Sequence, residues 1–250
     1  MNIDTKTQLY AIIGDPVEHS KSPAMQNEFF NNAGINAVYL AFHVKGEDLA
    51  DVVTGFKKLK ELCGFNVTVP HKVEIMKYLD EVDSVAKKIG AVNTVVVNNG
   101  KWFGYNTDWY GVFKTLEENK VSRDVKTLII GAGGAANGVV YGLQEYGISD
   151  IAITNRTAEK AEVIAKLFDI KTLDFASYQD KLNEYQLVIN TTTIPFGQMI
   201  ADFKKDVVYF DLKYYLESTP DFCIDGKTML HYQGVKAFEY WTGEKNKRLK

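Results

Sequence analysis

Cysteine and histidine are scarce in this chain. Of its 250 residues two are cysteines, Cys63 and Cys223, and four are histidines. Two isolated cysteines give no disulfide framework, so free thiols in a reducing cytoplasm are expected. The histidines, at positions 19, 43, 71 and 231, lack the spacing of metal ligands, and no metal is predicted.

Excess positive charge and long apolar runs are also lacking. The formal net charge is −3, with lysine and arginine spread along the chain, so no positive surface that attracts nucleic acid is expected. No apolar run reaches the roughly 18 to 20 residues that span a bilayer, and the polar residues 1–6 are unlike a signal peptide. The 46% hydrophobic content and five prolines instead indicate an ordered globular protein without nucleic acid or membrane partners.

Segments with strand and helix patterns alternate along the chain. In the first part, strands are expected at residues 9–13, 37–44 and 65–69, helices at 24–33 and 46–62, and a hairpin with an Asn-Gly turn at 91–103. In the second part, strands are expected at 125–130, 151–154, 187–190 and 207–210, and helices at 109–119 and 136–146. Such alternation predicts an α/β fold with parallel strands and right-handed crossovers.

Two hydroxyl side chains lie in the first strand-to-helix connection, residues 14–23. Ser20 and Ser22 are two residues apart, directly before a proline that can start a helix. Hydroxyls and free backbone N–H groups at a helix start can bind a small carboxylate. The alternative is a helix cap with spare serines.

A glycine-rich loop follows the expected strand at 125–130. It consists of Gly131, Ala132, Gly133, Gly134, Ala135 and Ala136, and a helix comes next. This order of strand, glycine loop and helix is typical of dinucleotide-binding sites, where the helix N-terminus receives the pyrophosphate.

The next strand ends without an acidic residue. It is followed by Asn155, Arg156 and Thr157, with Lys160 one helical turn further on. NAD-binding proteins place an acid here for the ribose 2′-hydroxyl, whereas an arginine accommodates the 2′-phosphate of NADP. The pattern therefore predicts NADP, although a surface arginine at a strand end is the simpler alternative.

Lys72 and Asp108 are the predicted catalytic pair. Lys72 comes directly after an expected buried strand, and Asp108 lies at the boundary between the two parts of the chain. Reduction of a ketone needs a proton donor at the oxygen, and an ammonium also stabilises a developing alkoxide. The alternative is a surface salt bridge, and the sequence leaves open whether Lys72 carries the proton or only stabilises charge.

The last expected helix, residues 228–241, has one polar side chain in its apolar stripe. The stripe is Leu230, Gln233, Gly234, Ala237, Phe238 and Trp241. Gln233 is therefore either a core amide bonded to backbone or an amide that faces a cleft.

Taken together, the motifs at residues 14–23, 66–72, 90–94, 104–108 and 131–136 resemble shikimate dehydrogenases over about residues 10–243. The resemblance implies an N-terminal substrate domain, residues 1–107 with 227–250, and a Rossmann-type NADP domain at 108–226, the C-terminal helix returning to the first domain. It implies reversible NADP-dependent oxidoreduction of shikimate and 3-dehydroshikimate in aromatic amino acid biosynthesis, by a monomer or homodimer.

The resemblance also implies roles for individual residues. Ser20 and Ser22 would bind the substrate carboxylate with Tyr214, while Thr68, Asn93 and Gln233 would bind ring hydroxyls beside Lys72 and Asp108. Thr192, Leu212 and Gly226 would join the glycine loop in binding the cofactor.

The chain departs from this family near the expected nicotinamide side. Thr191–Thr193 contain threonine where alanine is usual, Ile194, Pro195 and Phe196 replace a more glycine-rich segment, and Leu216 replaces the usual proline. The alternatives left open are a broader quinate/shikimate dehydrogenase, a methylenetetrahydrofolate dehydrogenase-like enzyme and a non-catalytic NADPH sensor.

Overall fold

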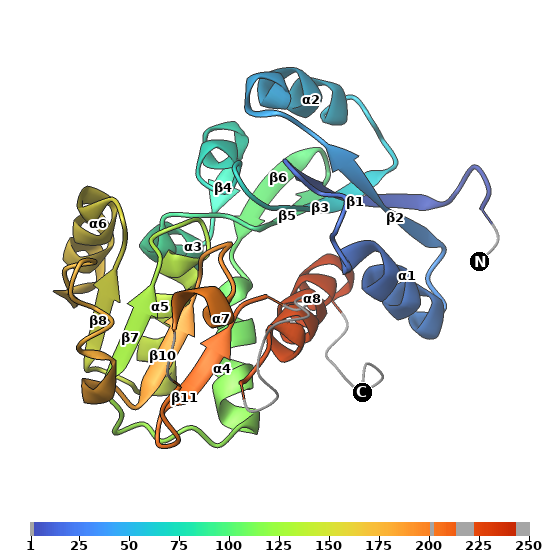
Figure 1. Ribbon diagram of the computed structural model, residues 1–250. Coiled ribbons are helices and arrows are strands. Elements are labelled where there is room, and N and C mark those ends of the chain that lie inside the picture. The colour runs from blue at the N-terminus through green and yellow to red at the C-terminus, as the bar shows by residue number, and fades with distance from the viewer. Residues whose placement is uncertain (1–2, 201–202, 214–222, 244–250) are drawn as a thin grey trace. The chain divides into compact units, whose positions relative to one another are not determined.

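Two β-sheets organise the chain, one in each of two structural units (Figure 1). The structure is a computed structural model that describes residues 3–200, 203–213 and 223–243. The first unit contains the described residues up to Thr107 and those from Gln233 onward, and the second extends from Asp108 to Tyr232.

The first unit contains a mixed sheet. Its strands are β1 (Gln8–Gly14), β2 (Ala37–His43), β3 (Leu62–Val67), β4 (Glu81–Val82), β5 (Thr94–Asn98) and β6 (Lys101–Tyr105). Its helices are α1 (Ser22–Ala33), α2 (Leu49–Phe56), α3 (Ser84–Ile89) and the second half of α8 (Lys227–Thr242). The strand order is β2-β1-β3-β5-β6-β4, with β1 parallel to both neighbours and β5 antiparallel to both of its own.

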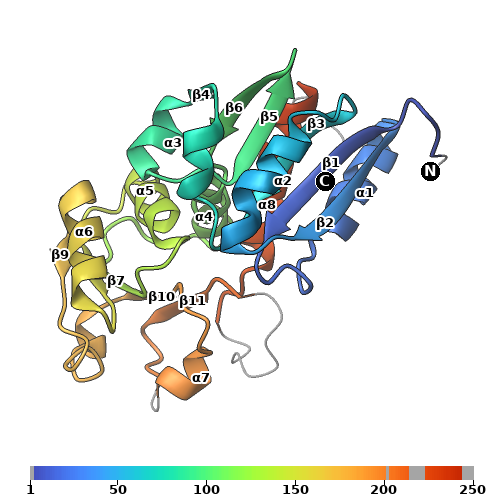
Figure 2. The same ribbon diagram turned by 90° about the horizontal axis from the view of Figure 1, so that it is seen from above.

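Alternating side chains of β1 divide the core of the first unit into two layers. Ala11 and Ile13 pack in a cluster with Trp102 and residues of α2, whereas Tyr10 and Ile12 pack with Phe238 of α8 and residues of α1. Successive strand residues point to opposite faces, so the sheet needs cover on both sides. Figure 2 shows α2 over one face and α1 with α8 over the other.

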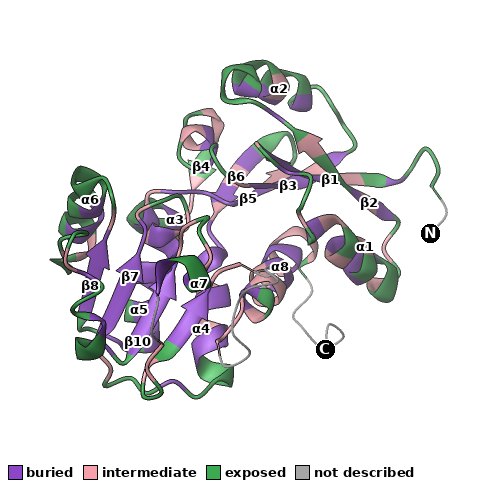
Figure 3. Ribbon diagram, viewed as in Figure 1, coloured by how far each residue is buried: buried purple, intermediate pink, exposed green. Residues whose placement is uncertain are grey.

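The second unit contains a parallel sheet. Its strands are β7 (Thr127–Ile130), β8 (Ile151–Thr154), β9 (Lys171–Thr172), β10 (Leu187–Asn190) and β11 (Val208–Asp211), in the order β11-β10-β7-β8-β9. Its helices are α4 (Asp108–Glu118), α5 (Ala136–Tyr146), α6 (Ala158–Phe168), α7 (Phe196–Met199) and the first half of α8. The strands β7, β8 and β10 are buried on both faces, as Figure 3 shows, which explains their continuous apolar sequences.

The strand order of the second sheet has a switch point between β7 and β10. The chain passes from β7 to β8 and β9 on one side, and later returns to β10 and β11 on the other side. In open α/β sheets, ligands bind outside the carboxyl ends of the strands at such a switch point.

The predicted α/β fold class, with the C-terminal helix returning to the first unit, is confirmed. The bounds of α5, β8 and β10 agree with the predictions, and the Asn-Gly hairpin is present as β5 and β6. The single helix expected at 46–62 was wrong: α2 ends at Phe56, and Leu62 begins β3 because it pairs with Leu9 of β1.

The apolar stripe predicted for α8 needs one correction. Leu230 and Gln233 are only half-buried, whereas Val235, which the stripe omitted, is fully buried. Gly234 lies directly against Met25, and the Gln26 side chain donates to the Gly234 carbonyl over 2.9 Å. Packing on α1 therefore determines which side chains of α8 are buried in the first unit.

Across residues 3–200, 203–213 and 223–243 no helix is both long and apolar enough to cross a membrane.

Candidate active site

In the first unit, four chain segments meet at one edge of the sheet. Because β1 and β3 are parallel, their carboxyl ends lie at the same edge, and because β5 is antiparallel to β3 and β6, its amino end and the carboxyl end of β6 lie there too. The predicted residues that follow or precede these strand ends are Ser20, Ser22, Thr68, Lys72 and Asn93. The topology thus brings five predicted site residues to one edge.

The two serines lie at the start of α1. The residue at the N-cap position is Lys21, whose side chain makes no capping hydrogen bond. Instead the Ser22 N–H donates to Ser20 Oγ over 3.3 Å. Ser22 is 6% exposed and Ser20 is half-buried. The pair forms a local polar turn at the helix start.

Lys72 is held in a buried position. The lysine residue is only 9% exposed, and its carbonyl accepts a hydrogen bond from Val92 N over 2.8 Å. Its neighbour His71 is also buried and contacts the Val44 carbonyl through Nε2 at 2.6 Å. Thr68 is joined to β1 through its N–H, which donates to the Ile13 carbonyl. Lysines are mostly exposed, so this burial does not fit the alternative of a surface salt bridge.

Asn93 is the centre of a buried polar cluster. Its Oδ1 accepts from Thr107 N at 2.8 Å and from Thr94 Oγ1 at 3.0 Å, and its Nδ2 donates to Thr107 Oγ1 at 3.0 Å. Asn93 thus fixes the segment that follows β6. Since Thr107 directly precedes Asp108, the same bonds also hold the residue before the predicted catalytic carboxylate.

Tyr39 and Asn66 extend this cluster, and the sequence analysis assigned neither a role. Tyr39 Oη donates to Asn66 Oδ1 over 2.7 Å, and Asn66 Nδ2 donates to the Asn93 carbonyl and to Thr94 Oγ1, both over 3.0 Å. The Ser22 side chain also bonds to the Tyr39 hydroxyl, while complete burial raises the pKa of Tyr39 well above its usual value. Asn66 is the first residue of the motif at residues 66–72, but no pattern in the sequence indicates that it contacts Tyr39.

Removing the Tyr39 hydroxyl should destabilise the first unit. Tyr39→Phe leaves the buried Asn66 Oδ1 without its donor, a loss of about 1 to 3 kcal/mol in the free energy of unfolding. The matched control is Tyr10→Phe, a buried tyrosine on β1 whose hydroxyl bonds to Gln8 at 3.3 Å and to the Cys63 thiol, neither of them fully buried, with an expected loss of about 0.5 kcal/mol or less. Urea unfolding measures both, and equal losses would contradict the prediction.

In the second unit, the glycine loop follows β7 at the switch point. Gly131 has a φ of +108°, and a Cβ there would lie 2.5 Å from Thr191 Oγ1, so this position requires glycine. Gly133 and Gly134 are exposed, and Ala135, the cap residue of α5, provides no side-chain cap. The helix start therefore offers backbone N–H groups to an anion such as a pyrophosphate.

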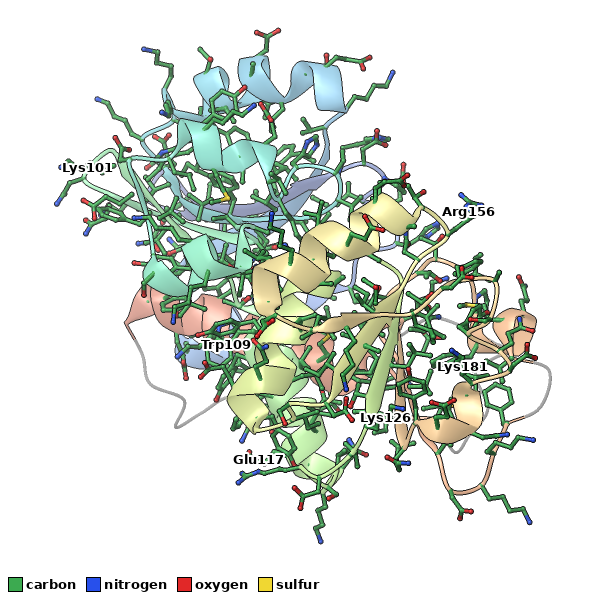
Figure 4. All side chains as sticks on the ribbon, turned by 90° about the vertical axis from the view of Figure 1, so that its left-hand side faces the viewer. Lys101, Trp109, Glu117, Lys126, Arg156 and Lys181 are labelled. Atoms are coloured by element: carbon green, nitrogen blue, oxygen red, sulfur yellow. The ribbon has the colours of Figure 1, made fainter. Side chains whose placement is uncertain are left out.

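Of the predicted cofactor residues after β8, Asn155 is held by hydrogen bonds and the others are exposed. Asn155 Oδ1 accepts from Ala132 N over 3.1 Å, and its Nδ2 donates to the Thr157 carbonyl, so Asn155 links two loops. Arg156, Thr157 and Lys160 are exposed, and Figure 4 shows Arg156 projecting outward. Thr157 begins α6 without a side-chain cap. Two cations beside an uncapped helix start fit a phosphate group.

The remaining cofactor residues lie around the ends of β10 and β11. Thr192 is half-buried in the loop after β10, Leu212 follows β11, and Gly226 donates through its N–H to the Lys213 carbonyl over 2.9 Å. Tyr214 and Leu216 lie outside the described residues. Together with the glycine loop, these residues surround the switch point and fit a dinucleotide.

Asp108 and Gln233 are described within their own units. Asp108 starts α4 and is 6% exposed, in the first helical turn that favours a carboxylate. Gln233 is half-buried on α8, so it is not the fully buried core amide of the simpler interpretation. Among the described residues no group of three His, Cys, Asp or Glu side chains is arranged to hold a metal ion.

The fold and the two polar regions define a class: two-domain α/β proteins in which a Rossmann-type nucleotide domain accompanies a second α/β domain. Within this class, the model of the shikimate dehydrogenase substrate binding domain matches residues 12–95, and that of shikimate / quinate 5-dehydrogenase matches residues 115–201. The chain belongs to the shikimate dehydrogenase family.

Individual relatives cover nearly the whole chain. The NADP(+) shikimate dehydrogenase of Methanococcus maripaludis (strain C7) is 42% identical and covers 97% of this chain, which covers 94% of that protein. The crystal structure of shikimate dehydrogenase from Aquifex aeolicus has a TM-score of 0.88 at 40% identity, covering 97% of this chain and 95% of the other. That of shikimate 5-dehydrogenase from Thermus thermophilus, in complex with NADP(H) and shikimate, has a TM-score of 0.82 at 29% identity, covering 95% and 94%.

Proposed function

We propose that this chain is an NADP-dependent shikimate dehydrogenase, which interconverts shikimate and 3-dehydroshikimate in aromatic amino acid biosynthesis. The observation that carries the proposal is the polar edge of the first sheet. Ser20, Ser22, Asn93 and the buried Lys72 flank the strand ends at that edge and supply two hydroxyls, an amide and an ammonium. This set matches a small ligand with one carboxylate and several hydroxyls. Membership of the family supports the same conclusion.

The two units then have separate tasks. Most of the substrate residues belong to the first unit: Ser20 and Ser22 bind the substrate carboxylate together with Tyr214, which lies outside the described residues, and Thr68, Asn93 and Gln233 bind ring hydroxyls. The second unit binds NADP at the glycine loop, with the 2′-phosphate at Arg156 and Lys160 and the nicotinamide side near Thr192, Leu212 and Gly226. The bound nicotinamide accepts or donates the hydride.

Lys72 and Asp108 act on the oxygen of the reacting carbon. In the reduction direction this oxygen gains negative charge as the hydride arrives, and a nearby ammonium stabilises that charge. A carboxylate beside an ammonium favours its charged form and directs it, which is the role proposed for Asp108.

Shikimate with NADP+ is the expected substrate pair. Shikimate should drive NADP+ reduction, with quinate at least tenfold lower in kcat/KM, a difference of about 1.4 kcal/mol in transition-state binding. The exposed Arg156 and Lys160, and the lack of an acid at the end of β8, should also make NADP+ the preferred cofactor over NAD+. The absorbance of reduced nicotinamide measures the rates of shikimate with NADP+, quinate with NADP+ and shikimate with NAD+.

The alternatives predict different results in the same assay. A quinate/shikimate dehydrogenase would show comparable kcat/KM for both substrates. A methylenetetrahydrofolate dehydrogenase-like enzyme would oxidise neither but would turn over methylenetetrahydrofolate when it is added, whereas an NADPH sensor would bind the cofactor and turn over none of the three.

The proposed setting is the cytoplasm, with a small molecule as the partner. A net charge of −3 offers no general attraction to nucleic acid. We expect a monomer or homodimer, which light scattering on a sizing column measures.

A further inference from the structure

A buried carboxylate and a buried amide end the two strands on one side of the switch point. Asp211 is the last residue of β11 and Asn190 the last of β10, and the two are paired in register. Both residues have 0% exposure. The sequence analysis gave neither a role, and the proposed reaction uses neither. A fully buried carboxylate is costly unless several donors surround it.

Three donors from three different positions surround the Asp211 carboxylate. Its Oδ2 accepts from Asn190 Nδ2 over 3.2 Å, its Oδ1 accepts from Lys213 N over 3.0 Å, and the backbone N–H of Phe196 also donates to it. Burial raises the pKa of Asp211, while these donors act in the opposite direction. The carboxylate thus joins the loop after β10 to the segment after β11.

Asn190 transmits this arrangement to the loop that carries Thr192. Its Oδ1 accepts from Thr192 N at 2.9 Å and from Thr192 Oγ1 at 2.8 Å, while its Nδ2 also donates to the Ile194 carbonyl at 2.7 Å. A carbonyl only accepts, so the Asn190 amide has one possible orientation. Thr192 in turn lies against the glycine loop, because a Cβ on Gly131 would be 2.7 Å from Thr192 Cγ2.

The same cluster fixes Leu212 and Gly226. Leu212 N donates to the Asn190 carbonyl over 3.1 Å, and Gly226 N donates to the Lys213 carbonyl over 2.9 Å. A Cβ on Gly226 would lie 2.0 Å from the Leu212 carbonyl oxygen, so only glycine permits this approach. Thr192, Leu212 and Gly226 are therefore held together through Asn190 and the residues that follow Asp211.

We propose that Asp211 and Asn190 are positioning residues that set the nicotinamide half of the cofactor site. They hold Thr192 and Leu212 against the glycine loop at the switch point, without touching the cofactor. The inference rests on the proposed function, because Thr192 and Leu212 are assigned to the cofactor there. The adenine and 2′-phosphate half, after β8, lies on the other side of β7 and takes part in none of the hydrogen bonds named for this cluster.

The test is Asp211→Asn, which keeps the shape of the side chain. The new amide must turn its NH2 group either toward Asn190 Nδ2 or toward Lys213 N, so two donors face each other. The expected result is that the Kd of NADP+ rises about tenfold, equivalent to about 1.4 kcal/mol, while kcat falls. The Kd of adenosine 2′,5′-bisphosphate, which lacks nicotinamide, should stay within about twofold. The control Asp206→Asn, an exposed carboxylate just before β11, should change none of these values.

Thr192→Val provides a second variant in case Asp211→Asn does not fold. It removes the hydroxyl that donates to Asn190 and keeps the branched shape. Thr192→Val should weaken NADP+ binding and leave binding of the bisphosphate unchanged. Where Asp211→Asn folds, the double variant should bind NADP+ only slightly more weakly than Asp211→Asn alone, since both changes act on one loop.

Two outcomes would overturn the inference. If either variant weakens NADP+ and the bisphosphate equally, or if it lowers the melting temperature but leaves NADP+ binding and kcat unchanged, the cluster has only a structural role. The binding measurements need no substrate. A wild-type protein that fails to oxidise shikimate would therefore contradict the proposed function, and the ratio of the two Kd values would still decide the role of Asp211.

Discussion

Lys72→Met is expected to lower kcat by about 10² to 10⁴, the range typical for the loss of a positioned acid–base group. Methionine keeps the length of the stem and removes the ammonium. Because the charge matters most when the oxygen becomes alkoxide-like, binding of the neutral shikimate hydroxyl should depend on it little. The Kd of shikimate should change by only a few-fold, and that of NADP+ should stay the same. Turnover gives kcat, and calorimetry on the inactive variant gives both Kd values.

Lys77→Met is the matched control for this variant. Lys77 lies five residues further along the chain, is exposed, and pairs with Glu74 at 2.8 Å. Exposed pairs of this kind contribute little, so its loss should leave kcat unchanged. If Lys72→Met instead kept a near wild-type kcat and bound shikimate poorly, Lys72 would be a binding residue. Asp108 or a water molecule would then have to carry the proton.

The fold could be predicted where hydrophobic periodicity and local stop signals agreed. Helix α5 and strands β8 and β10 have continuous patterns and clear ends, and their bounds were predicted correctly. Around Leu62 they conflicted, since Leu62 stands at helical spacing three residues after Leu59 but in fact pairs with Leu9 of β1. A pattern along the chain does not contain the partner strand, so it could not show where α2 ends. Val235 was missed for the same reason, because its neighbours come from the first unit's sheet and α1.

For the candidate site too, the sequence predicted some residues and not others. Short motifs contained Ser20, Lys72 and the glycine loop, and the structure places them at sheet edges where parallel strands end. The residues that hold these edges together could not be found locally. Tyr39 and Asn66 are 27 residues apart, and Asn190 and Asp211 are 21 apart. Each pair forms because the strands of one sheet bring it together, which becomes evident only once the strand order is known.

Arg156→Ala should separate the two nicotinamide cofactors. A hydrogen bond to a charged group contributes about 1.5 to 3 kcal/mol, so loss of the guanidinium should raise the KM of NADP+ about 10- to 150-fold. The KM of NAD+, which lacks the 2′-phosphate, should be nearly unchanged. Arg156 is exposed and follows β8 beside the uncapped start of α6, so its removal leaves the core intact. Initial rates with each cofactor at saturating shikimate measure both KM values.

Two further variants show whether the effect comes from this arginine or from positive charge in general. Lys166→Ala removes an exposed cation from the far end of α6 and should change neither KM, because exposed charges further apart than a Debye length of about 8 Å are screened at physiological salt. Lys160→Ala should raise the KM of NADP+ less than Arg156→Ala does, since a lysine offers a point charge and not a planar set of donors. An equal loss for NADP+ and NAD+ in Arg156→Ala would mean that Arg156 supports the adenine or the fold. The phosphate would then depend on Lys160 and on the backbone N–H groups at the start of α6, and Lys160→Ala would show the larger selective loss.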